Sequence, residues 1–326
     1  MSRPAHKWKS MSGTSRTVIA LATAGVIGAV AVGVSSASTV LPGHDQAPSQ
    51  ASGTASGRTH PYGLGAVPSP KGWRESELRT SVEPKLQAIA PNATAGSAGS
   101  KKHPALPSSV DLTKYAATPG NQGQVGSCAA WAIDYSAYSI LEHEQRISGG
   151  PQAPMYTFAQ IVKGNGDWGS SAEANFQIAS SQGIDSKSHY WQGNFDYTTQ
   201  PTASEIHNAA KWKLSGYTPL HNGSQIKADV QAALAKGEPV AIGIPVYNSF
   251  FYLNAQQAAS YTYSPASGEQ YAGGHEMTIV GYNSKGVRVE NSWGTGWGDH
   301  GFINLSWDFL AHQVWEANAV GKLIKR

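Results

Sequence analysis

The fold of this chain is decided by the stretch Asn121-Gln122-Gly123-Gln124-Val125-Gly126-Ser127-Cys128 and by the residues directly after it. The stretch is a Gly-rich turn, and residues 129–142 contain neither Gly nor Pro and have apolar positions that fit a buried helix. Ser127 is a good N-cap residue, which places Cys128 in the first helical turn. The helix dipole and the free backbone N–H groups there favour a thiolate. The sequence therefore predicts that Cys128 sits at an exposed corner with its sulfur stabilised as an anion.

Cys128 is the only cysteine among 326 residues, so the chain can form neither an internal disulfide nor a multi-cysteine metal site. A lone cysteine is either buried and inert or chemically reactive, and the turn before Cys128 favours a reactive role. A thiolate nucleophile also needs a proton carrier and a group that orients this carrier. Of eleven histidines, His275 has the most informative setting, because Gly273-Gly274 precedes it and an apolar strand pattern comes after it.

A second strand pattern covers residues 287–290 and ends at Asn291. Two strands joined by Asn283-Ser284-Lys285-Gly286 predict a hairpin, and this hairpin can bring the Asn291 amide beside His275. An amide oxygen there fixes one imidazole nitrogen and leaves the other facing the thiol. Spacing alone does not establish this arrangement, since a lone histidine is more often structural than catalytic.

At this point the chain resembles a known family, the papain-like cysteine peptidases. His275 and Asn291 lie 147 and 163 residues after Cys128, close to the separations typical of that family. The resemblance covers about residues 106–326, and it is nearer to bacterial secreted members without disulfides, because the opening resembles theirs at residues 106–112. The matching pieces, in the order of the family, are Gln122, Gly126-Ser127-Cys128, Gly274-His275 and Asn291-Ser292-Trp293-Gly294-Thr295-Gly296-Trp297-Gly298.

The resemblance implies an α+β fold in two parts, with the active site in the cleft between them. One part would be helical, over about residues 128–225, and the other β-rich and barrel-like, over about 226–318. The residues themselves agree with this division, because 226–236 predicts a helix that runs through a turn into a buried strand at 240–244.

The resemblance also implies a role for each matching residue. Cys128 would be the nucleophile, and His275 would be the base that later acts as an acid, with Asn291 as its orienter. Gln122 would donate its side-chain N–H to the oxyanion, alongside the backbone N–H of Cys128. The implied reaction is acyl transfer to water through an acyl-enzyme, and it requires no cofactor and no metal.

Substrate binding is implied for a further set of residues, which line the cleft in the family. Trp293 would also shield the hydrogen bond between His275 and Asn291 from water. The residue after the catalytic histidine borders the pocket for the second residue before the scissile bond. Because this residue is Glu276, we expect the pocket to tolerate a basic side chain. The set comprises Gly169, Ser170, Gly274, Glu276, Trp293 and Trp297.

Three features depart from the family pattern. Ala129 comes after the cysteine where family members usually carry Trp, and Val125 stands where many relatives have a second cysteine. The long helical pro-region of the better-known members is also missing, which leaves zymogen control open.

The first 105 residues predict export and a tether. Residues 1–37 combine basic residues, an apolar run and small residues before a cleavage site after Ala37. This pattern predicts a cleaved signal peptide in preference to a membrane anchor. Residues 38–105 form a low-complexity segment that is either a tether or a pro-segment. In the second case a short helix over Trp73 to Ile89 would cover the active site, and Lys101-Lys102 would be a nick site.

The charge distribution excludes a nucleic-acid binder. Residues 1–105 carry 11 Lys/Arg and 4 Asp/Glu, whereas residues 106–326 carry 13 and 17, so the folded part has no basic excess. We expect a secreted, extracellular monomer that acts on protein or peptide substrates and has no membrane association after signal cleavage. Two alternatives stay open: a non-catalytic peptide- or cell-wall-binding module on the same scaffold, and another Cys–His acyl transferase.

Other titratable residues point to no further chemistry. We expect Asp134, Glu142 and Glu144, on the helix after Cys128, to be solvated surface carboxylates. Five histidines outside the motifs share no spacing typical of metal ligands, so a metal site is not expected. These are His189, His207, His221, His300 and His312.

Overall fold

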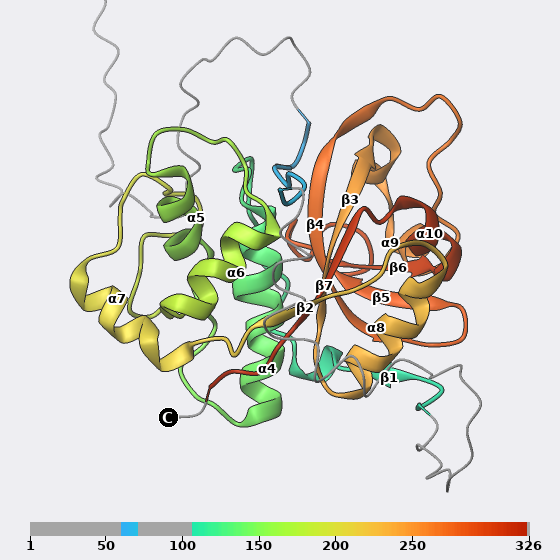
Figure 1. The fold of residues 1–326 in the computed structure, drawn as a ribbon. Helices are drawn as coiled ribbons and strands as arrows, with labels where there is room; N and C mark the ends of the chain where they lie inside the picture. Colours follow the sequence, from blue (N-terminus) through green and yellow to red (C-terminus); the bar gives the residue numbers. More distant parts are fainter. Residues whose placement is uncertain (1–59, 71–105, 325–326) are drawn as a thin grey trace, which may run out of the picture. The chain divides into compact units, whose positions relative to one another are not determined.

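An antiparallel sheet forms one part of the fold (Figure 1). The computed structural model describes residues 60–70 and 106–324. The sheet has the order β2-β7-β3-β4-β5-β6, and β1 pairs with β4. Its strands are β1 (Val110–Asp111), β2 (Tyr217–Pro219), β3 (Val240–Tyr247), β4 (Tyr271–Tyr282), β5 (Gly286–Glu290), β6 (Phe302–Ser306) and β7 (Glu316–Val320).

Strand β4 is the centre of the sheet and carries His275. Its register with β3 places His275 opposite Ile244, and its pairing with β5 places Thr278 opposite Glu290. The hairpin from β4 to β5 closes where Asn283 Oδ1 accepts from the backbone N–H of Lys285 at 2.8 Å. The hairpin predicted from the sequence is therefore present, and it brings the end of β5 back alongside β4.

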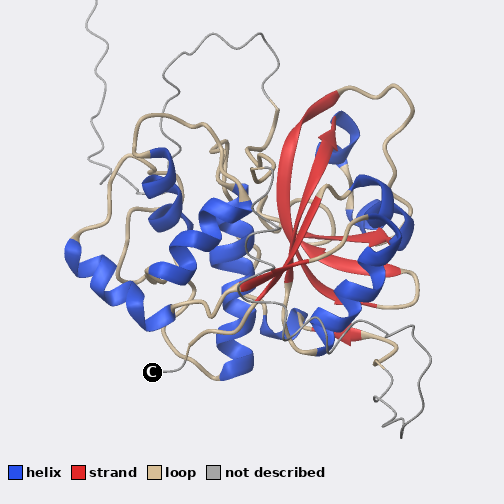
Figure 2. Cartoon of the chain, viewed as in Figure 1, coloured by secondary structure: helices blue, strands red, loops and turns tan. Residues whose placement is uncertain are grey.

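Most helices before residue 213 form the other part, and Figure 2 shows them gathered beside the sheet, whereas the later helices lie with the sheet itself. The chain starts this part with α3 (Cys128–Ala130), continues through a π-helix, η3 (Trp131–Ala137), and ends the same rod with α4 (Tyr138–Gln145). The remaining α-helices are α5 (Pro154–Val162), α6 (Ala172–Ser181), α7 (Ala203–Ala209), α8 (Ile226–Ala235), α9 (Ala255–Ala258) and α10 (Trp307–Gln313). Short 3₁₀ turns are η2 (Thr113–Tyr115), η4 (Ala210–Trp212), η5 (Gly223–Gln225) and η6 (Asn248–Tyr252).

Local sequence explains where these helices begin and which face they bury. Thr202 and Glu205 form a reciprocal capping box at the start of α7. In α8 the buried side chains recur at helical spacing, at Ile226, Val230, Ala233 and Leu234. The predicted helix, turn and buried strand over 226–244 is therefore present as α8 and β3.

Two apolar cores lie on the two sides of the rod that Cys128 begins. One core is built on the sheet with α8 and α10, and the other on α4 to α6. The rod contributes to both, since Ile140 packs in the first core whereas Ile133 and Leu141 pack in the second. The α+β fold with a helical part and a β-rich part is thereby confirmed.

The expectation of solvated surface carboxylates was wrong at two positions of the rod. Asp134 and Glu142 are buried, because the rod is enclosed by both parts and has no solvated face at these positions. Burial raises the pKa of Glu142 to about 8 and that of Asp134 well above its ordinary value. Glu144 is half-exposed and pairs with Lys322 at 2.7 Å. Ser127 precedes the helix as predicted, but its side chain makes no capping hydrogen bond.

Several expectations fall outside the described residues. These are the signal peptide at 1–37, the helix over Trp73 to Ile89 and the nick site at Lys101-Lys102. Among residues 60–70 and 106–324, no helix is long and apolar enough to span a membrane.

Candidate active site

Cys128 is the first residue of α3 and has no exposed surface. The backbone N–H groups of Glu276, Ala129 and Ala66 lie near its sulfur and favour the thiolate form. Glu276 directly follows His275 on β4, so the strand that carries the histidine also reaches the sulfur. Ala66 comes from a part of the chain more than fifty residues before the turn.

His275 is held by an amide and by an indole. Its Nε2 lies 2.7 Å from Asn291 Oδ1, and because this amide oxygen only accepts, Nε2 donates. The Trp293 ring stacks on the imidazole with 4.6 Å between ring centroids. The other ring nitrogen, Nδ1, is buried and has no hydrogen-bond partner among the described residues. This arrangement fixes the tautomer whose free nitrogen can accept a proton.

In the covered site, burial shifts both the thiol and the imidazole toward their neutral forms. Burial raises the pKa of Cys128 to about 12, and the nearby Glu276 carboxylate adds to this rise while the three backbone donors oppose it. Burial lowers the pKa of His275 to about 4, although its hydrogen bond with Asn291 opposes this. The expectation that Cys128 is exposed is wrong, and the loss of water opposes its thiolate more strongly than the backbone donors favour it.

Gln122 is fixed at both ends of its side-chain amide. Its Oε1 accepts from Ser292 Oγ at 2.5 Å, and its Nε2 donates to the carbonyl of Val125 at 2.8 Å. The second hydrogen of Nε2 is directed at the Leu64 carbonyl, 3.4 Å away. One N–H of the amide therefore donates within the turn, and the other is directed outside it.

Residues 60–70 cover this site. Their backbone lies between the loop that carries Ser170 and the strand that carries Gly274, and we call the space that they fill the groove. Gly65 and Ala66 donate to the Gly274 carbonyl at 3.0 and 3.1 Å. On the other side Ser170 donates to the Gly65 carbonyl at 3.0 Å, and Val67 donates to the Ser170 carbonyl at 3.1 Å. The segment is thus bonded to both walls and runs parallel to the chain at Ser170.

Side chains anchor the two ends of this segment. Tyr62 stacks on Trp293 with 4.8 Å between centroids, and the same indole stacks on the imidazole of His275. The Trp293 indole N–H donates to the Gly63 carbonyl at 3.0 Å. At the other end, Ser69 donates to the Glu316 carboxylate from its N–H at 3.1 Å and from its hydroxyl at 2.7 Å.

The residues that the sequence suggested for substrate binding occupy different places. Ser170, Gly274 and Trp293 hydrogen-bond to the segment, and a Cβ added at Gly169 would lie 2.1 Å from the Gly65 carbonyl. Trp297 packs edge-on against Trp293 and donates to the Phe250 carbonyl, so it lies in the packing behind the groove.

Glu276 and Glu316 bring two buried carboxylates to the same region. Burial raises the pKa of Glu276 well above its ordinary value, and the charges of Glu316 and Asp134 raise it further. Glu316 keeps a second donor, the Asn318 side-chain amide at 3.0 Å. Sequence reasoning missed Glu316 and residues 60–70, and it gave no role to Ser292 within the matching motif. The only signal of the segment was a short apolar cluster, Tyr62, Leu64 and Val67, within a polar tract.

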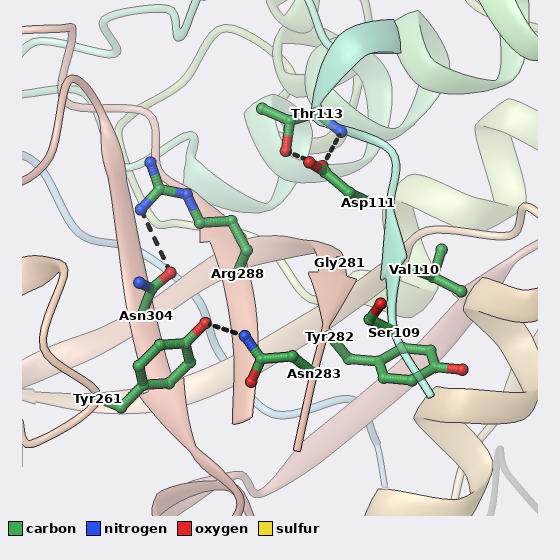
Figure 3. A pocket seen from close by; sticks show the side chains of 10 residues that line it. All are labelled: Ser109, Val110, Asp111, Thr113, Tyr261, Gly281, Tyr282, Asn283, Arg288 and Asn304. Atoms are coloured by element: carbon green, nitrogen blue, oxygen red, sulfur yellow. Dashed lines mark hydrogen bonds between the residues drawn. The ribbon is translucent and has the colours of Figure 1, made fainter. Parts of the chain in front are cut away.

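A second hollow lies away from Cys128, between β1 and the outer strands of the sheet (Figure 3). Its volume is about 400 Å³, and several of its polar side chains bond to one another. Arg288 donates to Asn304 and pairs with Asp299, and Asn283 donates to Tyr261. Within residues 60–70 and 106–324, no cluster of His, Cys, Asp and Glu could hold a metal ion.

Comparison with known proteins gives one family match. Residues 106–317 match the model described as papain family cysteine protease. A peptidase C1-like protein of Acanthamoeba polyphaga mimivirus is 25% identical over 204 residues, which are 59% of this chain and 65% of that protein. A cathepsin L-like proteinase of Fasciola hepatica is 26% identical over 218 residues, which are 62% of this chain and 61% of that protein. The chain thus spans less than two thirds of the length of these relatives.

Solved structures share the fold. Xylellain, a cysteine protease from Xylella fastidiosa, superposes with a TM-score of 0.63 at 20% identity, over 83% of this chain and 100% of that chain. Digestive procathepsin L 3 of Tenebrio molitor larval midgut gives a TM-score of 0.53 at 23% identity, over 68% of this chain and 72% of that chain.

Proposed function

The chain belongs to the papain family and is a papain-like cysteine peptidase, and we propose that it acts as a secreted endopeptidase through an acyl-enzyme on Cys128. One observation carries the assignment of the site. His275 donates from Nε2 to Asn291 and keeps Nδ1 free, while the backbone of the next residue on the same strand, Glu276, lies close enough to Cys128 to favour its thiolate.

Each step follows from these positions. His275 Nδ1 takes the thiol proton as the Cys128 sulfur attacks the peptide carbonyl carbon. The resulting oxyanion accepts from the Gln122 side-chain N–H and from the backbone N–H of Cys128. The imidazolium then gives its proton to the leaving amine, which departs and leaves a thioester. Water, deprotonated by His275, cleaves the thioester and restores the thiol.

We further propose that residues 38–105 form a pro-segment, of which residues 60–70 are the inhibitory part. The segment bonds to both walls of the groove and leaves Cys128 no exposed surface. The Ala66 backbone N–H lies near the sulfur, and the same group donates to the Gly274 carbonyl at 3.1 Å, so the segment is bonded to the groove beside the nucleophile. Cleavage at Lys101-Lys102 would release the tether between this segment and residue 106.

The proposed substrate class is a peptide with a basic side chain in the pocket that Glu276 borders. Glu316 lies close enough to raise the pKa of Glu276, and both of its oxygens bind Ser69 while the segment is in place. A cation from the substrate would allow both carboxylates to ionise. Fluorogenic peptides with Arg or Leu at the second residue before the scissile bond test this in wild type and Glu276→Gln. We expect a preference for Arg that the variant loses, and a strong wild-type preference for Leu contradicts the proposal.

The signal pattern at 1–37 supports export, and the resemblance at 106–112 supports a bacterial source. The decisive experiment is cleavage of a peptide library by the chain nicked at Lys101-Lys102, with Cys128→Ala as the matched control. We expect hydrolysis products from wild type alone. A protein that binds the peptides without cutting them would be a binding module, and products joined to an added amine would indicate an acyl transferase.

A further inference from the structure

Asp167 binds the turn that carries the nucleophile. Both of its carboxylate oxygens accept from the backbone N–H of Gly126, at 2.9 and 2.8 Å. A carboxylate that accepts from a backbone N–H forms one of the stronger hydrogen bonds of proteins. The fit is close, since a Cβ added at Gly126 would lie 2.6 Å from Asp167 Oδ1.

The peptide group between Val125 and Gly126 is held from both sides as a result. Its N–H donates to Asp167, and its carbonyl accepts from Gln122 Nε2 at 2.8 Å. Since a peptide group is planar, the direction of its N–H sets the direction of its carbonyl. Together with the Ser292 hydroxyl on Oε1, the carbonyl sets which way the Gln122 amide faces, and therefore where its second N–H points.

The loop that carries Asp167 needs an anchor on the turn. It contains left-handed glycines at 164 and 169, with φ of +65° and +75°, and it leads directly to Ser170 on the wall of the groove. The chain has one cysteine, so no disulfide can tie this loop to the turn. Burial raises the pKa of Asp167, and the hydrogen bond from Gly126 opposes the rise.

We propose that Asp167 is a positioning residue, which orients the oxyanion donor of Gln122 through the peptide group between Val125 and Gly126. The inference rests on the proposed peptidase activity. The carboxylate of Asp167 bonds to Gly126 and to neither Cys128 nor His275. Its effect must therefore pass through Gln122, and this distinguishes it from a residue that only folds the loop.

A double-mutant cycle tests this path, using nicked protein and a fluorogenic peptide. Loss of an oxyanion donor costs about a hundred- to a thousandfold in kcat, and a misplacement of about 1 Å costs up to about a hundredfold. We expect Gln122→Ala to fall in the first range and Asp167→Ala to lose about ten- to a hundredfold in kcat with little change in KM. The double variant should be no slower than Gln122→Ala alone.

Asp167→Asn keeps an acceptor of the same size, so we expect its kcat to lie within about fivefold of the wild-type value. Asp308→Ala, which removes an exposed carboxylate in α10, is the control and should match wild type. If the two losses multiply in the double variant, or if Asp167→Ala raises KM and spares kcat, Asp167 only supports the loop and the proposal is overturned.

A second readout does not depend on activity. Hydrogen exchange at the Gly126 amide of the full chain should accelerate at least about tenfold in Asp167→Ala and much less in Asp167→Asn. An unchanged exchange rate in Asp167→Ala overturns the inference even if the protein is inactive. If wild type hydrolyses no peptide while Gly126 exchange behaves as expected, the proposed function fails and the hydrogen bond stands.

Discussion

One added methyl group at Gly65 should expel the 60–70 segment from the groove. Gly65 has a φ of +127°, which L side chains rarely adopt. A Cβ there would lie 2.1 Å from the Gly126 carbonyl oxygen and 2.5 Å from the Gly126 Cα. These are backbone atoms of the turn before Cys128, so they cannot swing aside as a side chain would.

The size of the effect follows from the contacts that are lost. The left-handed backbone costs an L residue about 1–2 kcal/mol, and overpacking of a close contact adds about 1–3 kcal/mol. Each hydrogen bond that holds the segment contributes about 0.5–1.5 kcal/mol net, so Gly65→Ala removes a large share of the segment's binding energy. At about 1.4 kcal/mol for each factor of ten, the open population should rise by about thirtyfold or more.

Alkylation of Cys128 reports this population directly. A fluorescent iodoacetamide can label only one thiol in this chain, so no assignment is needed. We expect the full-length Gly65→Ala protein to be labelled at least about tenfold faster than wild type, within the shift estimated above. Gly216→Ala is the matched control, because Gly216 has a φ of +131° with nothing near its absent Cβ.

The reasoning would be refuted if folded Gly65→Ala were labelled at the wild-type rate. The same holds if Gly216→Ala accelerated labelling equally, since strain anywhere in the fold would then expose the thiol.

Two further predictions concern buried groups. Burial raises the pKa of Glu290 from 4.5 to about 8, so the contribution of this residue to the free energy of unfolding is most favourable below its ordinary pKa and falls as pH rises through the folded value. We therefore expect Glu290→Gln to raise the Tm near pH 8 by several degrees and to change it little near pH 4, since about 1 kcal/mol moves the Tm by about 2–4 °C. Calorimetry at the two pH values measures this difference. Equal Tm shifts at both pH values would contradict the prediction. Asn291→Ala should lower kcat at least about tenfold, though less than the roughly ten-thousandfold lost with a carboxylate orienter, because an amide holds His275 without a charge. Unchanged kcat on fluorogenic peptides would remove Asn291 from the site.

Much of the fold could be predicted from local patterns. The hairpin of β4 and β5 follows from two apolar runs around Asn283 to Gly286, and α8 with β3 follows from a helical stripe and a turn. These elements depend on neighbours in the sequence. The place of Asn291 beside His275 also follows from one short hairpin, which is why the spacing was informative.

The burial of the central rod could not be predicted in this way. Asp134 and Glu142 have the charge of surface residues, and only the packing of both parts around the rod removes them from water. The shift in the pKa of Cys128 could not be predicted from the sequence for the same reason. A helix terminus favours a thiolate, but the 60–70 segment excludes water, and desolvation is the larger effect.

Long-range contacts account for the rest. Asp167 lies 41 residues from Gly126, and Ser69 lies 247 residues from Glu316. No periodicity or turn signal links such pairs. Gly63 and Gly65 have the composition of a linker, although the structure uses them for close approach to the backbone of the groove.

The most direct test of the central claim is the reaction rate of Cys128 in the opened protein. The nicked chain and its Gly65→Ala form are treated with a peptidyl epoxide near neutral pH, beside glutathione as a free thiol and His275→Ala as the control. We expect a single adduct at Cys128, which forms much faster than the glutathione adduct and more slowly in His275→Ala. A rate equal to that of glutathione, or one indifferent to His275, would contradict it.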